Sequence, residues 1–264
     1  VGSEMCIRDR LLIVILSVIS AFFAGTFVLG FSVANPNGPQ KIYTFLSFIV
    51  GQSFMLIPLF WYLISRKHPL LKTLRIKPVP FSTIYYTVIL ALGVIVLSDE
   101  VDKIIQVFIE TPNYVVDLNG SLKPESFWGY FLLFIAVVII APIGEELLFR
   151  GFFQKILEES WKDVTKAVLV TALIFSFIHM NPFWFAQIYI LGILLGFLAW
   201  KTNSIIPSLI LHSLNNFIAL LLSFGVNDET SFYLYKGHVS PWILLLSIIF
   251  VYKGFKAINK SSVG

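Results

Sequence analysis

The fold of this chain is most constrained by eight apolar runs, each close to the length of a helix that crosses a membrane. About 20 apolar residues span the ~30 Å hydrocarbon core of a bilayer as an α-helix. The chain is 57% hydrophobic and only 13% charged, whereas soluble domains carry about 25% charged residues. We therefore expect an all-α, polytopic integral membrane protein with about eight transmembrane helices. The runs cover residues 11–34, 42–65, 84–98, 127–143, 165–180, 183–200, 204–224 and 239–252.

The basic residues indicate how the chain is oriented, because cytoplasmic loops are enriched in Lys and Arg. With the N-terminus inside, fifteen of the 19 basic residues fall in inside segments. The four on the outside are Lys41, Lys103, Lys123 and Lys236. We predict an integral protein of a bacterial cytoplasmic membrane with both termini cytoplasmic. Nucleic acid is not an expected partner, since the basic residues separate apolar runs instead of forming a stripe.

The N-terminal segment needs separate treatment. Residues 1–10 start without Met and differ in character from the run that follows, so we treat them as a non-native or disordered leader. Residues 11–34 end in Ser32-Val33-Ala34, which resembles a signal-peptide cleavage site, but the run is long for a signal peptide. We expect an uncleaved span and a single transmembrane domain over residues 11–260. The lone Cys6 excludes an internal disulfide.

The sequence GEELLFRG at residues 144–151 places charges at the end of an apolar run. A charge at membrane depth costs at least ~2.5 kcal/mol, so such residues are paired or functional. Glu146 and Arg150 are four residues apart, with the acid first, and are expected to form a structural ion pair. Glu145 points about 100° away from Glu146 on a helix. We expect Glu145 to find its partner on another helix.

The depth of Glu145 depends on where its helix ends. His179 would lie ~24 Å from the cytoplasmic face, and a helix ending at Arg150 would leave Glu145 far from it. Pro142 and Gly144 predict a kink, and helical periodicity continues beyond them. A helix that runs on to about Glu159 places Glu145 ~21 Å from its cytoplasmic end, level with His179.

The continuation, residues 149–159, is amphipathic. Its apolar residues Phe149, Phe152, Phe153, Ile156 and Leu157 lie opposite Gln154, Lys155, Glu158 and Glu159. We expect the phenylalanines to face lipid or a lipidated substrate and the polar residues to face the cytosol.

Further polar residues occur inside other apolar runs. His212 and Asn216 are four residues apart and share one helix face. With Glu145 and His179 they can form one buried polar site. Phe175 lies one turn before His179 and is expected to pack against its ring, and His68 and His238 fall in loops and are expected to be solvated.

Two chemistries suit these residues. In one, Glu145 and His179 activate a water while His212 and Asn216 donate hydrogen bonds to an oxyanion. In the other, Glu145, His179 and His212 ligate Zn²⁺, which activates the water. The chain has no HExxH sequence, so a metal-free mechanism is equally compatible with it.

These residues carry a family resemblance. EELLFRG resembles an EExxxR motif, residues 175–179 an FxxxH motif, and residues 212–216 an HxxxN motif. Together, in this order, they resemble the CAAX protease and bacteriocin-processing (CPBP or Abi) family of intramembrane proteases over about residues 127–224. The resemblance implies an eight-helix endopeptidase, often described as a metalloprotease. It assigns the reaction to Glu145 with His179, His212 and Asn216, and support of the helix to Glu146 and Arg150.

The resemblance also implies partners. The expected substrate is a peptide or membrane protein, including a lipidated one, and the sequence predicts no oligomeric state. A non-catalytic immunity or scaffold protein of the same fold is the main alternative. A transporter with a Glu and His proton relay is less favoured, because no repeat of spans is present.

Overall fold

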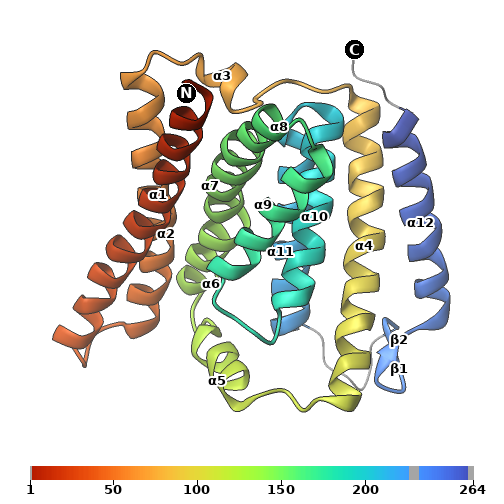
Figure 1. The fold of residues 1–264 in the computed structure, drawn as a ribbon. Coiled ribbons are helices and arrows are strands. Elements are labelled where there is room, and N and C mark those ends of the chain that lie inside the picture. The colour runs from red at the N-terminus through yellow and green to blue at the C-terminus, as the bar shows by residue number, and fades with distance from the viewer. Residues whose placement is uncertain (1, 226–231, 261–264) are drawn as a thin grey trace. The chain divides into compact units, whose positions relative to one another are not determined.

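The computed structural model describes residues 2–225 and 232–260, which form helices and one short antiparallel ribbon (Figure 1). Seven described helices are long and apolar enough to cross a membrane, and an eighth apolar helix, α9 (Val164–Ile178), is shorter. The prediction of a polytopic all-α membrane protein with about eight spans is confirmed. The chain divides into two compact units, residues 1–78 with 124–209 and residues 79–123 with 210–264.

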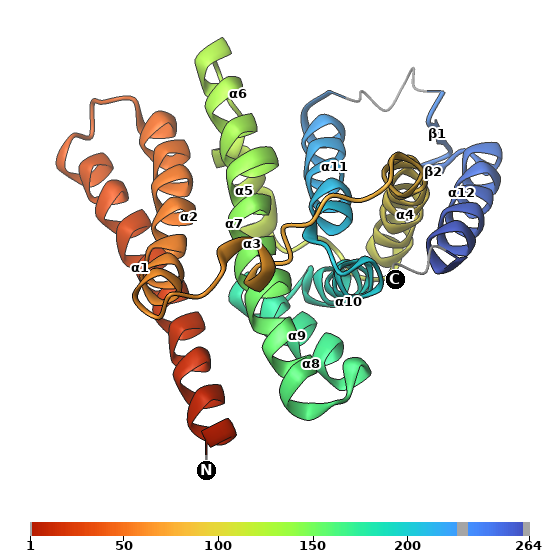
Figure 2. The same ribbon diagram turned by 90° about the horizontal axis from the view of Figure 1, so that it is seen from above.

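The first unit begins with a pair of helices, α1 (Gly2–Ala34) and α2 (Gln40–Ser65), which lie side by side in Figures 1 and 2. Their backbones approach closely at two glycines. A Cβ added to Gly51 would lie 3.0 Å from the Ala21 carbonyl oxygen, and one added to Gly25 would lie 3.3 Å from the Ser47 carbonyl oxygen. Small residues at such points allow transmembrane helices to pack by van der Waals contact.

One compound helix runs from Phe127 to Trp161. It consists of α6 (Phe127–Phe134), η1 (Ile135–Ile140), α7 (Ala141–Glu145), η2 (Glu146–Gln154) and α8 (Lys155–Trp161), with η1 and η2 in π-helical conformation. Pro142 lies at the start of α7. Proline lacks an N–H and crowds the carbonyl one turn earlier, so a wider π turn before it relieves the clash. The prediction that this helix continues to about Glu159 is confirmed.

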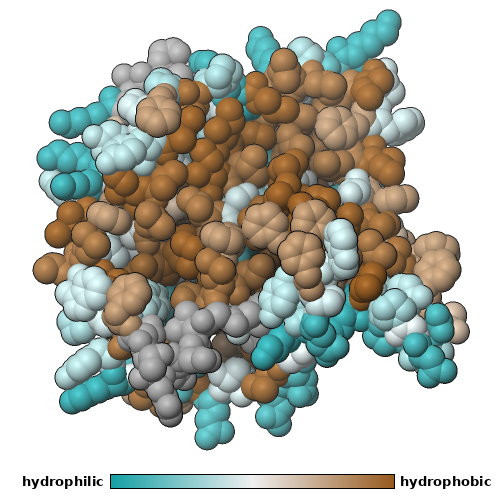
Figure 3. Space-filling view, turned by 180° about the vertical axis from the view of Figure 1, so that it is seen from behind, coloured by the Kyte–Doolittle hydropathy of each residue, from teal (hydrophilic) through white to brown (hydrophobic). Residues whose placement is uncertain are grey.

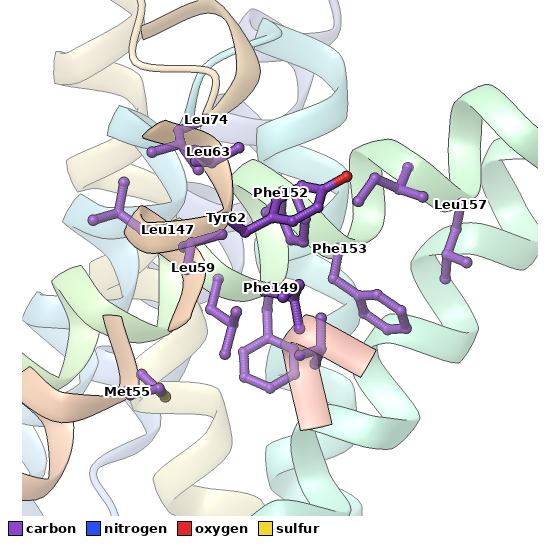
Figure 4. Packing of buried hydrophobic residues seen from close by; sticks show 14 of the residues in the cluster. Met55, Leu59, Tyr62, Leu63, Leu74, Leu147, Phe149, Phe152, Phe153 and Leu157 are labelled. Carbon is purple, nitrogen blue, oxygen red and sulfur yellow. The ribbon is translucent and has the colours of Figure 1, made fainter. Parts of the chain in front are cut away.

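The core of the first unit surrounds the second half of the compound helix (Figure 4). Phe149, Phe152 and Phe153 are 0%, 2% and 3% exposed and pack among residues of α1, α2 and α9. The expectation that these rings face lipid or substrate is therefore wrong. Gln154, expected to face the cytosol, is also fully buried. Helical periodicity identifies an apolar face, but it does not distinguish whether lipid or protein covers that face.

The remaining helices of the first unit are α3 (Leu70–Thr73), α9 and α10 (Phe185–Thr202). Helices α9 and α10 pack against each other and against η2. Asp163 caps α9, because its carboxylate accepts a hydrogen bond from the backbone N–H of Lys166 at 2.9 Å. The cap fixes the start of the helix that carries His179 at its other end.

The second unit contains α4 (Phe81–Phe108), α5 (Asn113–Leu122), most of α11 (Ile205–Gly225) and α12 (Pro241–Lys260). Helices α4 and α12 pack closely, since a Cβ on Gly93 would lie 2.6 Å from the Ser247 carbonyl oxygen. The ribbon joins β1 (Leu234–Tyr235) to β2 (His238–Val239). His238, expected to be solvated, is only partly exposed and contacts Glu100 at 2.9 Å.

Large apolar side chains also cover much of the outer surface, as Figure 3 shows for one face. Such exposure is the expected property of helices that face lipid. Residues 2–10 continue α1 without a break. That residues 1–10 are non-native, and that residues 11–260 form one domain, stay predictions.

Candidate functional site

Glu145 ends α7 and its side chain is buried, with 6% of the residue exposed. Gln52 of α2 donates its Nε2–H to Glu145 Oε1 at 3.0 Å. Gly144 permits this approach, because a Cβ there would lie 3.4 Å from the Gln52 carbonyl oxygen and 3.0 Å from Met55. The prediction that Glu145 finds its partner on another helix is confirmed. Gln52 itself was not predicted, although a Gln inside an apolar run is a detectable signal.

Glu146 and Arg150 form the expected ion pair. Arg150 Nη1 donates to Glu146 Oε1 at 2.8 Å, and both side chains are fully buried. The guanidinium also donates to the Gly192 carbonyl of α10 at 3.3 Å, and its Cζ lies 4.1 Å from the centre of the Phe175 ring. Arg150 thus ties the compound helix to both α9 and α10.

His179 follows the last residue of α9 and is exposed. Its Nδ1 lies 2.7 Å from the Phe175 carbonyl oxygen. A carbonyl oxygen only accepts hydrogen bonds, so we assign the proton to Nδ1. In the neutral ring, Nε2 then keeps its lone pair for a proton, a water or a metal ion.

Phe175 is the packing residue that the sequence predicted. Its ring makes an edge contact with His179 at 4.7 Å and with Phe149 at 5.5 Å, and it lies under the Arg150 guanidinium. Aromatic edge contacts and a cation over a ring face are both favourable geometries. Phe175 therefore holds His179 against the segment that follows Glu145.

A longer row of polar residues extends the ion pair along the same helix. Glu146, Arg150, Gln154 and Glu158 follow one another at four-residue intervals, and we call them the polar stripe. Gln154 Nε2 donates to the Gly196 carbonyl oxygen at 2.9 Å and to Glu158 Oε1 at 2.8 Å. The four-residue spacing of these polar residues is visible in the sequence. The amphipathic pattern predicted that they face solvent, but in the structure other parts of the protein cover them.

Arg75 closes the end of the polar stripe. It forms a buried two-pronged ion pair with Glu158, and its Nη1 lies 3.4 Å from the Arg150 carbonyl oxygen. The Arg75 carbonyl also accepts a hydrogen bond from the backbone N–H of Ile205 at 3.0 Å. Arg75 is one of the fifteen basic residues expected on the inside, and this structural role was not predicted.

His212 and Asn216 belong to the second unit, on α11. His212 is 3% exposed and Asn216 is half-buried. Asn215 Nδ2 lies 3.4 Å from Asn216 Oδ1. Glu145 and His179 belong to the first unit, and the structure describes each unit by itself, so the union of all four residues in one site stays a prediction.

A zinc site would need three protein ligands and an open position for water. Glu145 and His179 are the two candidates that the first unit supplies, while His212 belongs to the second. Across the described residues, no group of three His, Cys, Asp or Glu side chains lies close enough to hold a metal ion. The described residues of the first unit therefore supply two of the three ligands, and a zinc site would also need His212.

The comparisons with known proteins bear on the same part of the chain. Residues 127–218 match the family model described as Type II CAAX prenyl endopeptidase Rce1-like. UPF0177 protein YbdI of Lactococcus lactis subsp. lactis (strain IL1403) is 28% identical to this chain over 98 residues, which are 37% of this chain and 52% of that protein. The chain therefore spans about half the length of this curated relative. No solved structure gives a significant match.

The matched segment contains Glu145, His179, His212 and Asn216. The family resemblance indicated by the three motifs is thereby confirmed for residues 127–218, the segment that matches the Rce1-like family model.

Proposed function

We propose that this chain is an intramembrane endopeptidase of the CAAX protease type, with Glu145 as its reacting carboxylate. One observation carries the proposal. The two adjacent buried carboxylates have different partners, since Glu146 is paired with a guanidinium and Glu145 accepts a hydrogen bond from the neutral amide of Gln52. A carboxylate positioned by a neutral hydrogen-bond donor can take a proton from water.

The reaction is peptide hydrolysis by an activated water. The water oxygen attacks the scissile carbonyl carbon while its proton passes to Glu145, which later returns it to the leaving amine. The free Nε2 of His179 would accept a hydrogen bond from the same water and orient it. His212 and Asn216 would donate hydrogen bonds to the oxyanion. This step requires His212 and Asn216 to lie in the same site as Glu145.

Zinc is a second way of activating the water. A bound Zn²⁺ would act as a Lewis acid and lower the pKa of its water. Elemental analysis of active, purified protein separates the two versions. Activity that is lost on chelation and restored by zinc supports the metal, and full activity in a metal-free preparation excludes it.

The proposed substrate is a peptide or a membrane protein, including a lipidated one, cleaved in a bacterial cytoplasmic membrane. The exposed Ser160, just before the end of the compound helix, should lie on the cytoplasmic side with both termini. A single Cys at this position, in a Cys6→Ser background, should react with an impermeant thiol reagent only in inverted vesicles. Reaction in right-side-out vesicles would reverse the orientation.

The experiment on activity compares cells that carry wild-type protein, Glu145→Gln or Glu110→Gln. Glu110 is an exposed carboxylate and controls for loss of one negative charge. We expect at least one membrane-associated peptide or protein to accumulate uncleaved with Glu145→Gln and not with Glu110→Gln, as measured by quantitative mass spectrometry of protein termini. Identical termini in all three strains would favour the non-catalytic immunity or scaffold alternative.

A further inference from the structure

The first unit contains a cavity of about 240 Å³ away from Glu145. It lies where the start of α1, the segment around α3 and the end of the compound helix meet. Three cationic residues, Arg10, Lys72 and Lys155, line it together with His68, against one carboxylate, Glu159. We call this the basic cavity. Its charge balance suits an anionic ligand.

Hydrogen-bond donors in the basic cavity are available for a ligand. Arg10 Nε is buried and has no hydrogen-bond partner among the described residues. The Lys72 ammonium makes no ion pair with any residue that the structure describes. Lys155 Nζ donates to the Lys72 carbonyl oxygen at 2.6 Å, which leaves two of its three protons free. Arg10 belongs to residues 1–10, which are expected to be a leader, so Lys72 and Lys155 are the cations that a ligand would require.

The surroundings of the basic cavity are apolar. Phe152 and Ile156 line the cavity itself. Leu71, next to Lys72, is 65% exposed on α3. In a membrane protein, an exposed leucine beside cationic residues is typical of the boundary between headgroups and acyl chains.

We propose that the basic cavity binds the phosphate group of an anionic phospholipid. The cationic side chains would contact the phosphate, and an acyl chain would lie along the exposed Leu71 of α3. The apolar border distinguishes this ligand from a soluble phosphate, which needs only the charges. Cationic pockets at the cytoplasmic end of transmembrane helices commonly recognise anionic headgroups.

The test is native mass spectrometry of the full chain in detergent with added phosphatidylglycerol or phosphatidylcholine. Each cation near an anionic headgroup strengthens lipid binding, so removing two cations should weaken it. The double variant Lys72→Gln/Lys155→Gln should bind phosphatidylglycerol about 25-fold more weakly than the wild type. Phosphatidylcholine, which has no net charge, should bind weakly to both proteins. Equal retention of phosphatidylglycerol by wild type and double variant would overturn the proposal.

Three controls sharpen the result. Lys67→Gln removes an exposed cation from the same loop outside the cavity and should bind lipid like wild type. Lys155→Arg keeps the charge and should also retain binding, and thermal unfolding in detergent checks that each variant is folded. Inorganic phosphate is added as a competitor. If it displaces phosphatidylglycerol at equal concentration, the cavity is a site for soluble anions and the lipid proposal fails.

Discussion

Glu145 and Glu146 are neighbours in sequence and both are buried, but they lie in different surroundings. Glu146 begins the polar stripe and pairs with Arg150, while Arg150 and Gln154 donate hydrogen bonds to α10 and Glu158 pairs with Arg75. Glu145 faces α2 and receives a hydrogen bond from an uncharged amide. In the first arrangement the polar side chains link neighbouring helices, and their charges are paired with one another. The second positions a carboxylate through a neutral hydrogen-bond donor, as a general base requires.

The largest loss of stability should follow removal of the charge at the centre of the polar stripe. Arg150→Ala leaves Glu146 buried without its guanidinium partner, and breaking a buried pair in this way costs about 3–5 kcal/mol. We expect a marked fall in folded yield, measured by size-exclusion chromatography and thermal unfolding in detergent. Arg150→Lys keeps the charge and should recover part of the yield. Wild-type yield for Arg150→Ala would mean that the stripe does not support the fold.

Glu145→Gln should give the opposite result. The amide is close in shape to the carboxylate and can still pair with Gln52, so the folded yield should stay near wild type. Loss of a general base lowers the rate of cleavage by about 10²–10⁴-fold. The measurement is cleavage per folded molecule, with Glu110→Gln as the matched control. If Glu145→Gln and Arg150→Ala lose the same yield, the two carboxylates do not have separate roles.

Arg75 tests the other end of the polar stripe. Arg75→Ala removes the pair with Glu158, but Glu158 keeps the hydrogen bond from Gln154. The expected cost is therefore smaller, about 2 kcal/mol, near the value for leaving a buried polar group partly unsatisfied. Adding Glu158→Gln to Arg75→Ala should restore part of the lost stability, as measured by thermal unfolding. Additive effects of the two substitutions would show that the pair is not coupled.

The sequence predicted the features that depend on local spacing. Each of these features depends on spacing within a single helix. On the compound helix they are the Glu146 and Arg150 pair, the continuation past Pro142 and the need of Glu145 for a partner. On α9 it is the packing of Phe175 on His179. The misses involve contacts between distant segments. Gln52 and Arg75 reach the compound helix from elsewhere in the chain, and Phe149, Phe152, Phe153 and Gln154 are buried because α1, α2, α9 and α10 surround them.

The smallest expected effect comes from the residue that holds Glu145. Gln52→Met keeps the size of the side chain and removes its donor, so packing against Gly144 should persist while Glu145 loses one hydrogen bond. A misaligned base should slow cleavage by about tenfold to a hundredfold.

Folded yield separates a positioning role of Gln52 from a packing role. A positioning role predicts slower cleavage with near-normal thermal unfolding, and no further slowing when Gln52→Met is added to Glu145→Gln, because the group being positioned is already gone. Gln106→Met is the matched control, since Gln106 is exposed on α4 and donates a hydrogen bond to Asp102 on the same helix. Cleavage by Gln52→Met at the wild-type rate would show that Glu145 does not depend on this amide, and the contrast between the two carboxylates would then rest on Arg150 alone.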